Sequence, residues 1–422
     1  MLSKIKKRIQ KYSAVLGPGL TTGAADDDPS GIATYSQAGA QYGYSVLWLA
    51  LFSFPLMAIV QTMCARIGIV TGKGLAANIR MRYGTEALMF VCVLLFFANT
   101  LNIAADLAAM AAAIELLLPQ LNTMLLIALI GFSIVWLEIY LPYNQYASVL
   151  KYLTLALFSY VIAVLAIDVD WGKVVTHTLI PTIEFTPQFF ILLCAILGTT
   201  ISPYLFFWQT SQEVEDRAHR KSNAPNTSDA SLIRAALKRM HVDVWSGMAF
   251  SNIVMFCIML TCAATLHEHG ITTITSAESA ANALRPVAGT MTYIFFTVGI
   301  IGTGLLAIPI LAGSSAYALA EAFEWTHGLN KQLHEAYAFY GVITLSVFLG
   351  IFLNWFEFDP MQLLLYASVL NGLIAPVILC CIVAIAGSLK IQRTKGATLY
   401  AGYALVFLLA FVAVAALYAI AQ

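Results

Sequence analysis

The sequence has little charge. Aspartate, glutamate, lysine and arginine together make up only 10% of its 422 residues, whereas a soluble domain carries about 25%. The formal net charge is zero, so the composition does not predict the basic surface with which proteins bind nucleic acid. Because 60% of the residues are hydrophobic and the mean hydropathy is +0.81, the composition predicts a polytopic membrane protein surrounded by the lipid bilayer, with no soluble domain.

The common signatures of enzymes and of bound cofactors are also absent. The seven cysteines form no CxxC pair and no Cys/His metal spacing, and the sequence contains neither a phosphate-binding loop nor a nucleotide fingerprint. We therefore expect no enzymatic activity, no cofactor and no cleavable signal peptide. The cysteines are expected to be free, buried thiols, at positions 64, 92, 194, 257, 262, 380 and 381.

The chain instead contains a series of long apolar segments. About 20 apolar residues cross a bilayer as a helix, and by this measure the sequence predicts about eleven spans. They lie near residues 14–40, 45–70, 87–117, 122–140, 147–167, 188–212, 243–266, 289–320, 337–355, 361–388 and 398–420. The segment 213–242 is predicted to be a polar connection, and SNAPNTSDAS within it to be flexible.

The lysines and arginines predict the orientation, because cytoplasmic loops are enriched in them. If the basic N-terminal residues are cytoplasmic, the alternation of the spans places most other cations on the same side. Only Lys173 and Arg285 fall clearly outside. We expect a plasma-membrane (inner-membrane) protein with a cytoplasmic N-terminus and an external C-terminus. The cytoplasmic set includes Lys73, Arg80, Arg82, Lys151, Arg217, Arg220, Lys221, Arg234, Lys238, Arg239, Lys331, Lys390, Arg393 and Lys395.

The first span contains an unusual acidic segment, GPGLTTGAADDDPSG, at residues 17–31. Its three consecutive aspartates, Asp26, Asp27 and Asp28, directly precede Pro29. Carboxylates at membrane depth are costly and mark ion or proton paths. The proline lacks a backbone donor and disfavours helical geometry at Asp28. The segment therefore predicts a broken membrane helix with a cation site at the break.

The sixth span contains a second break, GTTISPY, at residues 198–204, where Ser202 precedes Pro203. The two breaks begin two successive blocks of five spans, and because five is odd the second block is inverted. Interrupted helices at matching places in inverted halves indicate a transport site at the membrane midplane, served by alternating access. We predict a single membrane domain with inverted repeats near 14–167 and 188–388 and an extra helix near 398–420.

At these motifs the sequence resembles the Nramp family of divalent-metal transporters. The stretch GPGLTTGAADDDPSGIATYSQAGA resembles the GPG, DPGN and QAGA-like pattern of that family's first span. ARIGIVTGKGLA at 65–76 and GTTISPYLFF at 198–207 resemble its second-span and sixth-span segments. The resemblance implies an all-α, leucine-transporter-type 5+5 inverted repeat of about eleven transmembrane helices, in which helices 1 and 6 are broken and hold the metal between them.

Several positions depart from the family pattern. Asp28 matches the liganding aspartate, but Gly31 stands where a liganding asparagine would be. Ser202 replaces the methionine of the family's Met-Pro-His motif. Thr199 falls where the family offers a backbone carbonyl, and Asn371 aligns loosely with a liganding glutamine. These changes resemble the Nramp-related magnesium transporters, a branch that moves Mg²⁺ and is not driven by protons.

Ligand chemistry leads to the same expectation. A thioether favours soft cations, whereas carboxylate, hydroxyl and carbonyl oxygens suit Mg²⁺, Ca²⁺ or Mn²⁺. Small residues at Gly31 and Ser202 leave room, and Mg²⁺ tends to keep several waters. Asp27, with Asp26, either enlarges the negative field, lines an access path or bonds to local backbone. We expect transport of divalent cations, chiefly Mg²⁺ and also Mn²⁺, as substrates rather than cofactors.

Proton coupling requires titratable groups along the path. The seven histidines fall in loops or at span ends. Asp106 is the clearest central carboxylate after the first span, and it is either a relay or a structural hydrogen-bond partner. Ala109 replaces the glutamate that the family has three residues later, and Tyr204 replaces the sixth-span histidine. We therefore expect transport that is not proton-coupled.

Three alternatives remain open. The first is a proton-coupled Mn²⁺/Fe²⁺ importer of the ordinary Nramp kind. The second is a sodium-coupled amino-acid transporter of the same fold, which the acidic break disfavours because the substrate would be anionic. The third is an intramembrane aspartyl protease, which needs two opposed carboxylates sharing a proton, so that Asp106 would have to face the acidic break. The sequence does not indicate an oligomeric state.

Overall fold

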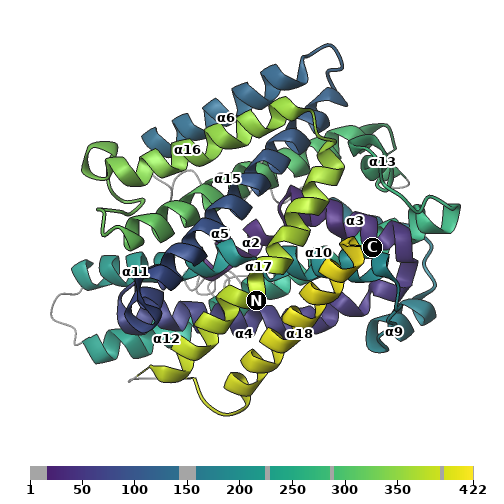
Figure 1. Ribbon diagram of the computed structural model, residues 1–422. Helices are drawn as coiled ribbons and strands as arrows, with labels where there is room; N and C mark the ends of the chain where they lie inside the picture. The colour runs from purple at the N-terminus through teal and green to yellow at the C-terminus, as the bar shows by residue number, and fades with distance from the viewer. Residues whose placement is uncertain (1–16, 142–157, 224–228, 286–288, 390–393, 422) are drawn as a thin grey trace, which may run out of the picture.

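The computed structural model describes residues 17–141, 158–223, 229–285, 289–389 and 394–421. This part of the chain is almost entirely helical and contains no strand (Figure 1). The first half contains α2 (Pro18–Asp26), α3 (Pro29–Tyr42), η1 (Gly43–Val46), α4 (Trp48–Thr71), α5 (Leu75–Glu115), α6 (Thr123–Tyr140), α8 (Phe158–Ala166) and α9 (Trp171–Leu179). The second half contains α10 (Pro187–Thr200), α11 (Pro203–Asn223), α12 (Asp229–Thr265), η3 (His267–His269), α13 (Ala277–Asn282), η4 (Gly289–Met291), α15 (Thr292–Ala322), η5 (Leu333–Glu335), α16 (Tyr337–Leu353), η6 (Asn354–Phe356), α17 (Pro360–Ser388) and α18 (Ala397–Ile420).

Nine helical segments in the described residues are long and apolar enough to cross a membrane. They match nine of the predicted spans. The first span is present as two shorter helices, α2 and α3. The fifth predicted span falls mostly on residues 142–157, which lie outside the described part. The basic residues before residue 17 and Lys151 also lie outside it.

Both predicted helix breaks are confirmed. Helix α2 ends at Asp26, and Asp28 has extended backbone (φ −68°, ψ 172°) before Pro29 begins α3. Helix α10 ends at Thr200, and Pro203 begins α11. Proline has no N–H to donate and a fixed φ, so it starts a helix easily and weakens one in its interior, although Pro55, Pro309 and Pro376 lie inside continuous helices. The two breaks fall at corresponding places in the two repeats.

Glycine contacts hold each broken helix against a continuous one. A Cβ added at Gly23 of α2 would lie 2.3 Å from the carbonyl oxygen of Gly247 on α12. A Cβ added at Gly198 of α10 would lie 2.3 Å from the backbone nitrogen of Gly372 on α17. Small residues allow helix backbones in membranes to approach this closely. The same device therefore occurs in both repeats, on the half-helix that precedes each break.

The segment 213–242, predicted to be a polar connection, is mostly helical. Helix α11 continues to Asn223 and α12 begins at Asp229, while residues 224–228 lie outside the described part. Helix α12 has 37 residues, which at 1.5 Å per residue is roughly 55 Å and exceeds the bilayer core of about 30 Å. The segment connects two spans as predicted but has helical ends, because helices that cross the membrane continue into water with polar sequences. The prediction that SNAPNTSDAS is flexible falls partly on residues 224–228, outside the described part. Helix α5 likewise begins at Leu75, before the predicted span, and bends at Gly84 (φ 87°).

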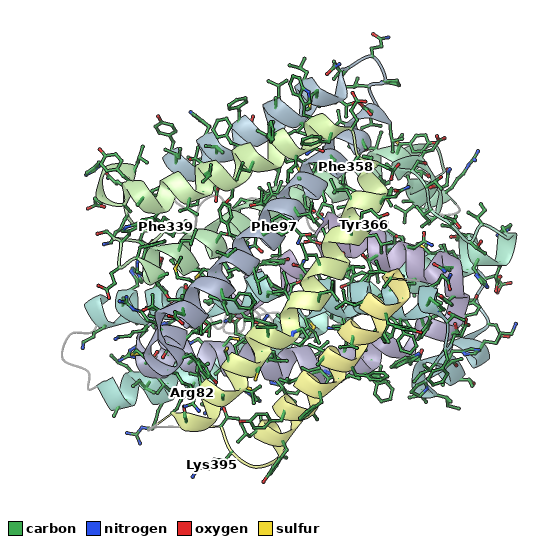
Figure 2. The ribbon with its side chains drawn as sticks, viewed as in Figure 1. Arg82, Phe97, Phe339, Phe358, Tyr366 and Lys395 are labelled. Carbon is green, nitrogen blue, oxygen red and sulfur yellow. The ribbon has the colours of Figure 1, made fainter. Side chains whose placement is uncertain are left out.

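The outer surface of the bundle is apolar, as contact with lipid requires. Figure 2 shows large apolar and aromatic side chains around the bundle, among them Phe97 on α5 and Tyr366 on α17, which are 61% and 59% exposed. All seven cysteines are free, as expected. Five are buried, but the expectation of burial was wrong for Cys380, which is exposed, and Cys381 is only partly covered.

The two ends of the bundle have cavities with different linings. We call the end that carries Lys73, Arg80 and Lys331 the basic end; these residues line one cavity there together with Glu215, Glu321 and Glu324. The far end carries the C-terminus of α3 and the N-termini of α10 and α17, where uncharged glutamines line a second cavity.

Candidate metal site at the broken helices

The site begins at Asp28, which forms the N-cap of α3. Its Oδ1 accepts hydrogen bonds from the Gly31 N–H at 2.7 Å and from the Ser30 hydroxyl at 2.6 Å. The side chain is only 1% exposed. The N-cap geometry therefore fixes one oxygen of a buried carboxylate at the break.

Tyr204, at the start of α11, links the two broken helices. Its hydroxyl lies 3.0 Å from the carbonyl oxygen of Ala25 and 3.4 Å from Oδ2 of Asp28. The residue is fully buried. One side chain of the sixth span thus contacts both halves of the first span, at the position where the family motif has histidine.

Asp26 and Asp27 face α12. The Ser251 hydroxyl lies 2.6 Å from Oδ2 of Asp26 and 3.4 Å from Oδ1 of Asp27. Among the described residues the other oxygen of each carboxylate has no hydrogen-bond partner, and both residues are fully buried. A buried carboxylate without a partner is costly.

Gly31 and Thr199 bring α3 against α10. The Ser30 and Thr199 hydroxyl oxygens lie 3.4 Å apart. A Cβ added at Gly31 would lie 3.2 Å from the Asp26 carbonyl oxygen and 3.3 Å from Oγ1 of Thr199. A side chain at position 31 would therefore be tightly packed between the two broken helices beside Asp28.

Ser202 is turned toward the end of α10. Its hydroxyl donates to the carbonyl oxygens of Gly198 at 2.9 Å and Thr199 at 2.5 Å. The Thr199 carbonyl, predicted to face a cation, thus accepts this bond as well. Sequence alone could not predict this orientation, because a motif match gives the position of a residue but not its rotamer.

Two further buried side chains approach the break. Among the described residues, no hydrogen bond of normal geometry reaches the carboxylate oxygens of Asp106 on α5 or the amide atoms of Asn371 on α17, although the Ser30 backbone N–H lies near Asp106. Both residues are at most 1% exposed. Asp106 lies close enough to Asp28 for their carboxyl groups to interact electrostatically. Asn371 follows Ser368, whose hydroxyl accepts a 3.0 Å bond from Thr34 of α3. Unsatisfied buried polar groups are rare enough to need an explanation.

The structure therefore brings Asp27, Asp28, Gly31 and Thr199 to one break and places Asn371 on an adjoining helix. It also adds residues that sequence reasoning did not select. Ser251 belongs to an ordinary apolar span, and only its neighbour Asn252 gives a weak polar signal. The contact of Tyr204 with Asp28 follows from packing across 176 positions of sequence, which no local pattern reports.

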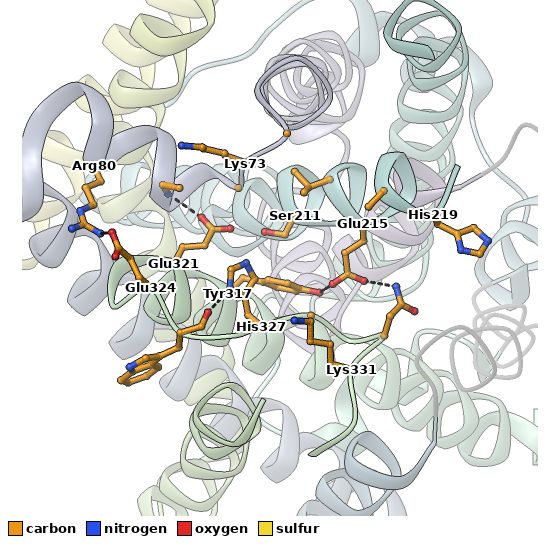
Figure 3. Close-up of a pocket in the computed structure, with 18 of the residues that line it drawn as sticks. Lys73, Arg80, Ser211, Glu215, His219, Tyr317, Glu321, Glu324, His327 and Lys331 are labelled. Carbon is orange, nitrogen blue, oxygen red and sulfur yellow. Dashed lines mark hydrogen bonds and ion pairs between the residues drawn. The ribbon is translucent and has the colours of Figure 1, made fainter. Parts of the chain in front are cut away.

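A cavity of about 1080 Å³ lies at the basic end, and none of the aspartates of the break lines it. Figure 3 shows Tyr317 and Glu215 pointing toward each other there, with Lys331 and His327 beside them. Glu215 accepts bonds from the Tyr317 hydroxyl and the Leu329 N–H. The carboxylates in this cavity already have partners, since Glu321 accepts from the Ala77 N–H at 2.9 Å and Glu324 pairs with Arg80 at 2.5 Å. The cavity at the basic end therefore fits a metal ion less well than the break between α2 and α3 does.

Known proteins share this architecture. The crystal structure of the Eremococcus coleocola manganese transporter aligns with a TM-score of 0.78 and 16% identity, covering 97% of this chain and 87% of that one. The inward-facing structure of Mhp1 aligns with a TM-score of 0.56 and 17% identity, covering 96% and 89%. At these identities the likeness concerns the fold alone. It confirms the predicted all-α, leucine-transporter-type inverted repeat.

Sequence comparison identifies the family. The divalent metal cation transporter MntH of Verminephrobacter eiseniae is 27% identical over 300 residues, covering 68% of this chain and 64% of that protein, so the chain aligns with less than two thirds of that relative. MntH of Erwinia tasmaniensis is 28% identical over 300 residues, covering 69% and 68%. The model of the Nramp family, described as natural resistance-associated macrophage protein-like, matches residues 19–422. This multi-pass membrane chain therefore belongs to the Nramp family.

Proposed function

We propose that this protein transports divalent metal cations across its membrane, chiefly Mg²⁺ and also Mn²⁺, by alternating access. Family membership supports divalent-cation transport, since relatives carry that activity in their names. The observation that carries the preference for Mg²⁺ is the donor set at the break. The Asp28 carboxylate lies there beside the Ser30 and Tyr204 hydroxyls, and serine stands at position 202 in place of a thioether.

The concentration of carboxylates supports a dication as substrate. Asp26, Asp27, Asp28 and Asp106 are all fully or almost fully buried, and the described cations that form ion pairs lie elsewhere. Buried charges of one sign need compensation. A divalent cation supplies two positive charges in one small volume, whereas an anionic amino acid would add to the repulsion. This disfavours the sodium-coupled amino-acid alternative.

The small number of free side-chain donors at the break supports an ion that keeps part of its hydration shell. Gly31 offers no side chain as a ligand, and Ser202 keeps its hydroxyl on the α10 carbonyls. Mg²⁺ gives up its waters reluctantly and binds through one or two carboxylates. In the proposed site Asp28 is the principal ligand. Thr199, Ser202, Asp27 and Asn371 contact the ion directly or through its waters.

The absence of a titratable series on α5 supports uncoupled transport. The residues that follow Asp106 toward the basic end on the same helix face are Asn102 and Asn99, both neutral amides. Asn99 donates to the Ser314 and Ser315 hydroxyls of α15 at 2.9 Å each. The driving force is then the metal gradient and the membrane potential.

A proton-coupled Mn²⁺ importer is the second candidate. The buried Asp106 beside Asp28 favours it, because two neighbouring buried carboxyls are suited to exchanging a proton for a cation. The manganese transporter named above also shares the fold. We propose a plasma-membrane location with the basic end and the N-terminus cytoplasmic and the C-terminus outside, and no enzymatic activity.

Metal-by-metal uptake into proteoliposomes tests the function. We expect saturable uptake of Mg²⁺ and of Mn²⁺ by the wild-type protein. Uptake of Mn²⁺ or Cd²⁺ without any uptake of Mg²⁺ would assign the protein to the ordinary metal-importing type. Uptake of no divalent cation would refute the proposed function as a whole.

A further inference from the structure

A second polar cavity lies at the end opposite to the basic end. It has a volume of about 280 Å³ and lies between α3, α10, α17 and the segment that follows η3. Its polar lining residues are all uncharged, and the remainder of its lining is apolar. We call this cavity the amide vestibule, and its polar lining consists of Gln37, Gln41, Gln188, Gln362, Thr273 and Thr275.

A polar stripe along α3 leads from the amide vestibule to the candidate site. Ser30, Thr34, Gln37 and Gln41 recur every three or four residues and therefore share one face of the helix. Ser30 donates to Asp28 at the inner end of the stripe. Gln37 and Gln41 line the vestibule at its outer end.

A hydrogen bond between two hydroxyls crosses this stripe. Oγ1 of Thr34 on α3 lies 3.0 Å from Oγ of Ser368 on α17, and both residues are fully buried. Along α17, Gln362 lies on the vestibule side of Ser368, and the unpartnered Asn371 lies on the other. Helices α3 and α17 thus contact each other at Ser368, which lies between the vestibule residue Gln362 and Asn371 along α17.

The wall of the amide vestibule is tied to α3 by one side chain. Oε1 of Gln37 accepts the Ile274 N–H at 2.8 Å, and its Nε2 donates to the Thr272 carbonyl at 3.3 Å and to Oε1 of Gln41 at 3.1 Å. Gln37 therefore has a structural role. Gln41 and Gln362 are the better probes of any ligand.

We propose that the amide vestibule is a second cation site, which receives the hydrated divalent cation from outside by hydrogen bonds to its bound waters before it reaches Asp28. This inference rests on the proposed function. Amide and hydroxyl oxygens accept hydrogen bonds from metal-bound water without displacing it. Six waters at about 30 Å³ each occupy about 180 Å³, which the cavity accommodates. A neutral lining binds the ion weakly enough to release it inward, as conduction through successive sites requires.

The test uses the double variant Gln41→Ala/Gln362→Ala in proteoliposomes with the far end facing outward. The probe is hexaamminecobalt(III), a cation that does not exchange its ligands and presents N–H groups where hydrated Mg²⁺ presents O–H groups. We expect the KM for Mg²⁺ to rise about thirtyfold, which corresponds to two lost hydrogen bonds at roughly 1 kcal/mol each, with Vmax unchanged. Inhibition by hexaamminecobalt(III) should weaken to a similar extent. The matched control is Gln120→Ala, an exposed glutamine between α5 and α6 at the same end, which should change neither value.

An unchanged KM, or a lower Vmax at the wild-type KM, would overturn the proposal. Calorimetry separates it from the function at Asp28. Hexaamminecobalt(III) should still bind the Asp28→Asn protein and should lose affinity only when Gln41 and Gln362 are also replaced. Loss of binding in the Asp28→Asn protein alone would place the probe at the break and refute the vestibule site. If the protein transports no divalent cation, the proposed function is refuted. The calorimetry with hexaamminecobalt(III) would still show whether the amide vestibule binds a hydrated cation.

Discussion

The carboxylate of Asp243 on α12 accepts a 2.7 Å hydrogen bond from the backbone N–H of Gly19 in the first turn of α2. The same carboxylate accepts bonds from the N–H groups of Gly17 at 2.7 Å and Leu20 at 3.2 Å. Helix α2 has nine residues, and a helix this short is marginal without tertiary support. A side chain 224 positions away thus satisfies the free donors of the half-helix that precedes Asp28, and it places a negative charge where the helix dipole favours one.

Replacement of Asp243 should destabilise this half-helix. Asp243→Ala removes three hydrogen bonds to one charged group, and we expect a loss of about 2 kcal/mol of unfolding free energy. Thermal unfolding in a single detergent would measure it. The matched control is Asp359→Ala, which removes one exposed N-cap bond to the Gln362 N–H at 2.9 Å and should cost less. Equal losses in the two variants would contradict the anchoring role of Asp243.

Asp28→Asn should abolish metal uptake without unfolding the protein. The amide oxygen can still accept the bonds from Gly31 and Ser30, since asparagine is as good an N-cap as aspartate. The negative charge that the ion needs is lost. Uptake of Mg²⁺ and Mn²⁺ into proteoliposomes should fall to the background of empty liposomes, at a wild-type unfolding temperature. Substantial saturable uptake by this variant would refute the assignment of Asp28 as the principal ligand.

Ser251→Ala tests the two other aspartates of the break. The Ser251 hydroxyl is the described hydrogen-bond donor to both Asp26 and Asp27, so its removal should destabilise the protein without substrate by about 1–3 kcal/mol. Ser246→Ala, on the same helix but exposed, is the control and should have little effect. Because a bound dication also compensates these carboxylates, added Mg²⁺ should raise the unfolding temperature of Ser251→Ala more than that of the wild type. An equal rise in both proteins would argue that the ion does not interact with Asp26 and Asp27.

The sequence predicted the local features of this protein better than its long-range contacts. The Asp28–Pro29 and Ser202–Pro203 breaks follow from the chemistry of proline, which acts on its immediate neighbours. The bonds of Asp243 to α2 and of Ser251 to Asp26 join positions more than 200 residues apart, and hydropathy contains no information about them. The helical ends of α11 and α12 were missed for a related reason, because apolar patterning detects only the part of a helix inside the bilayer. The rotamer of Ser202 depends on which carbonyls of α10 are free, and this is known only once the break has formed.

Introducing sulfur at position 202 should shift the cation preference. Ser202→Met removes the hydroxyl that bonds to Gly198 and Thr199 and adds a soft donor beside the break. We expect Cd²⁺ affinity to rise about tenfold, which is about 1.4 kcal/mol, and Mg²⁺ uptake to fall. Titration calorimetry and uptake would measure the two effects, with Ser202→Leu as the control of similar size without sulfur.

The double variant Ser202→Met/Gly31→Asn restores the family's ligand set. The new Cβ at position 31 would lie 3.2 Å from the Asp26 carbonyl oxygen, so the neighbouring backbone would have to shift to accommodate it. If Cd²⁺ binds Ser202→Met and Ser202→Leu with equal affinity, residue 202 does not face the ion.

Transport should proceed without coupled protons. Ala109 and Tyr204 stand where the family has titratable residues, and Asn102 and Asn99 continue the α5 face beyond Asp106. Each Mg²⁺ carries two charges, so about 4.6 kcal/mol per 100 mV of membrane potential is available for inward movement without a second ion. Liposomes clamped at a negative internal potential and loaded with a pH-sensitive dye should take up Mg²⁺ or Mn²⁺ with no change in internal pH. The remaining candidate for a relay is Asp106, which is fully buried, and if transport is uncoupled Asp106→Asn should leave the dye signal as it is in the wild type. Acidification in fixed proportion to metal uptake, lost in Asp106→Asn, would instead assign Asp106 as a proton carrier and place this protein with the proton-driven metal importers.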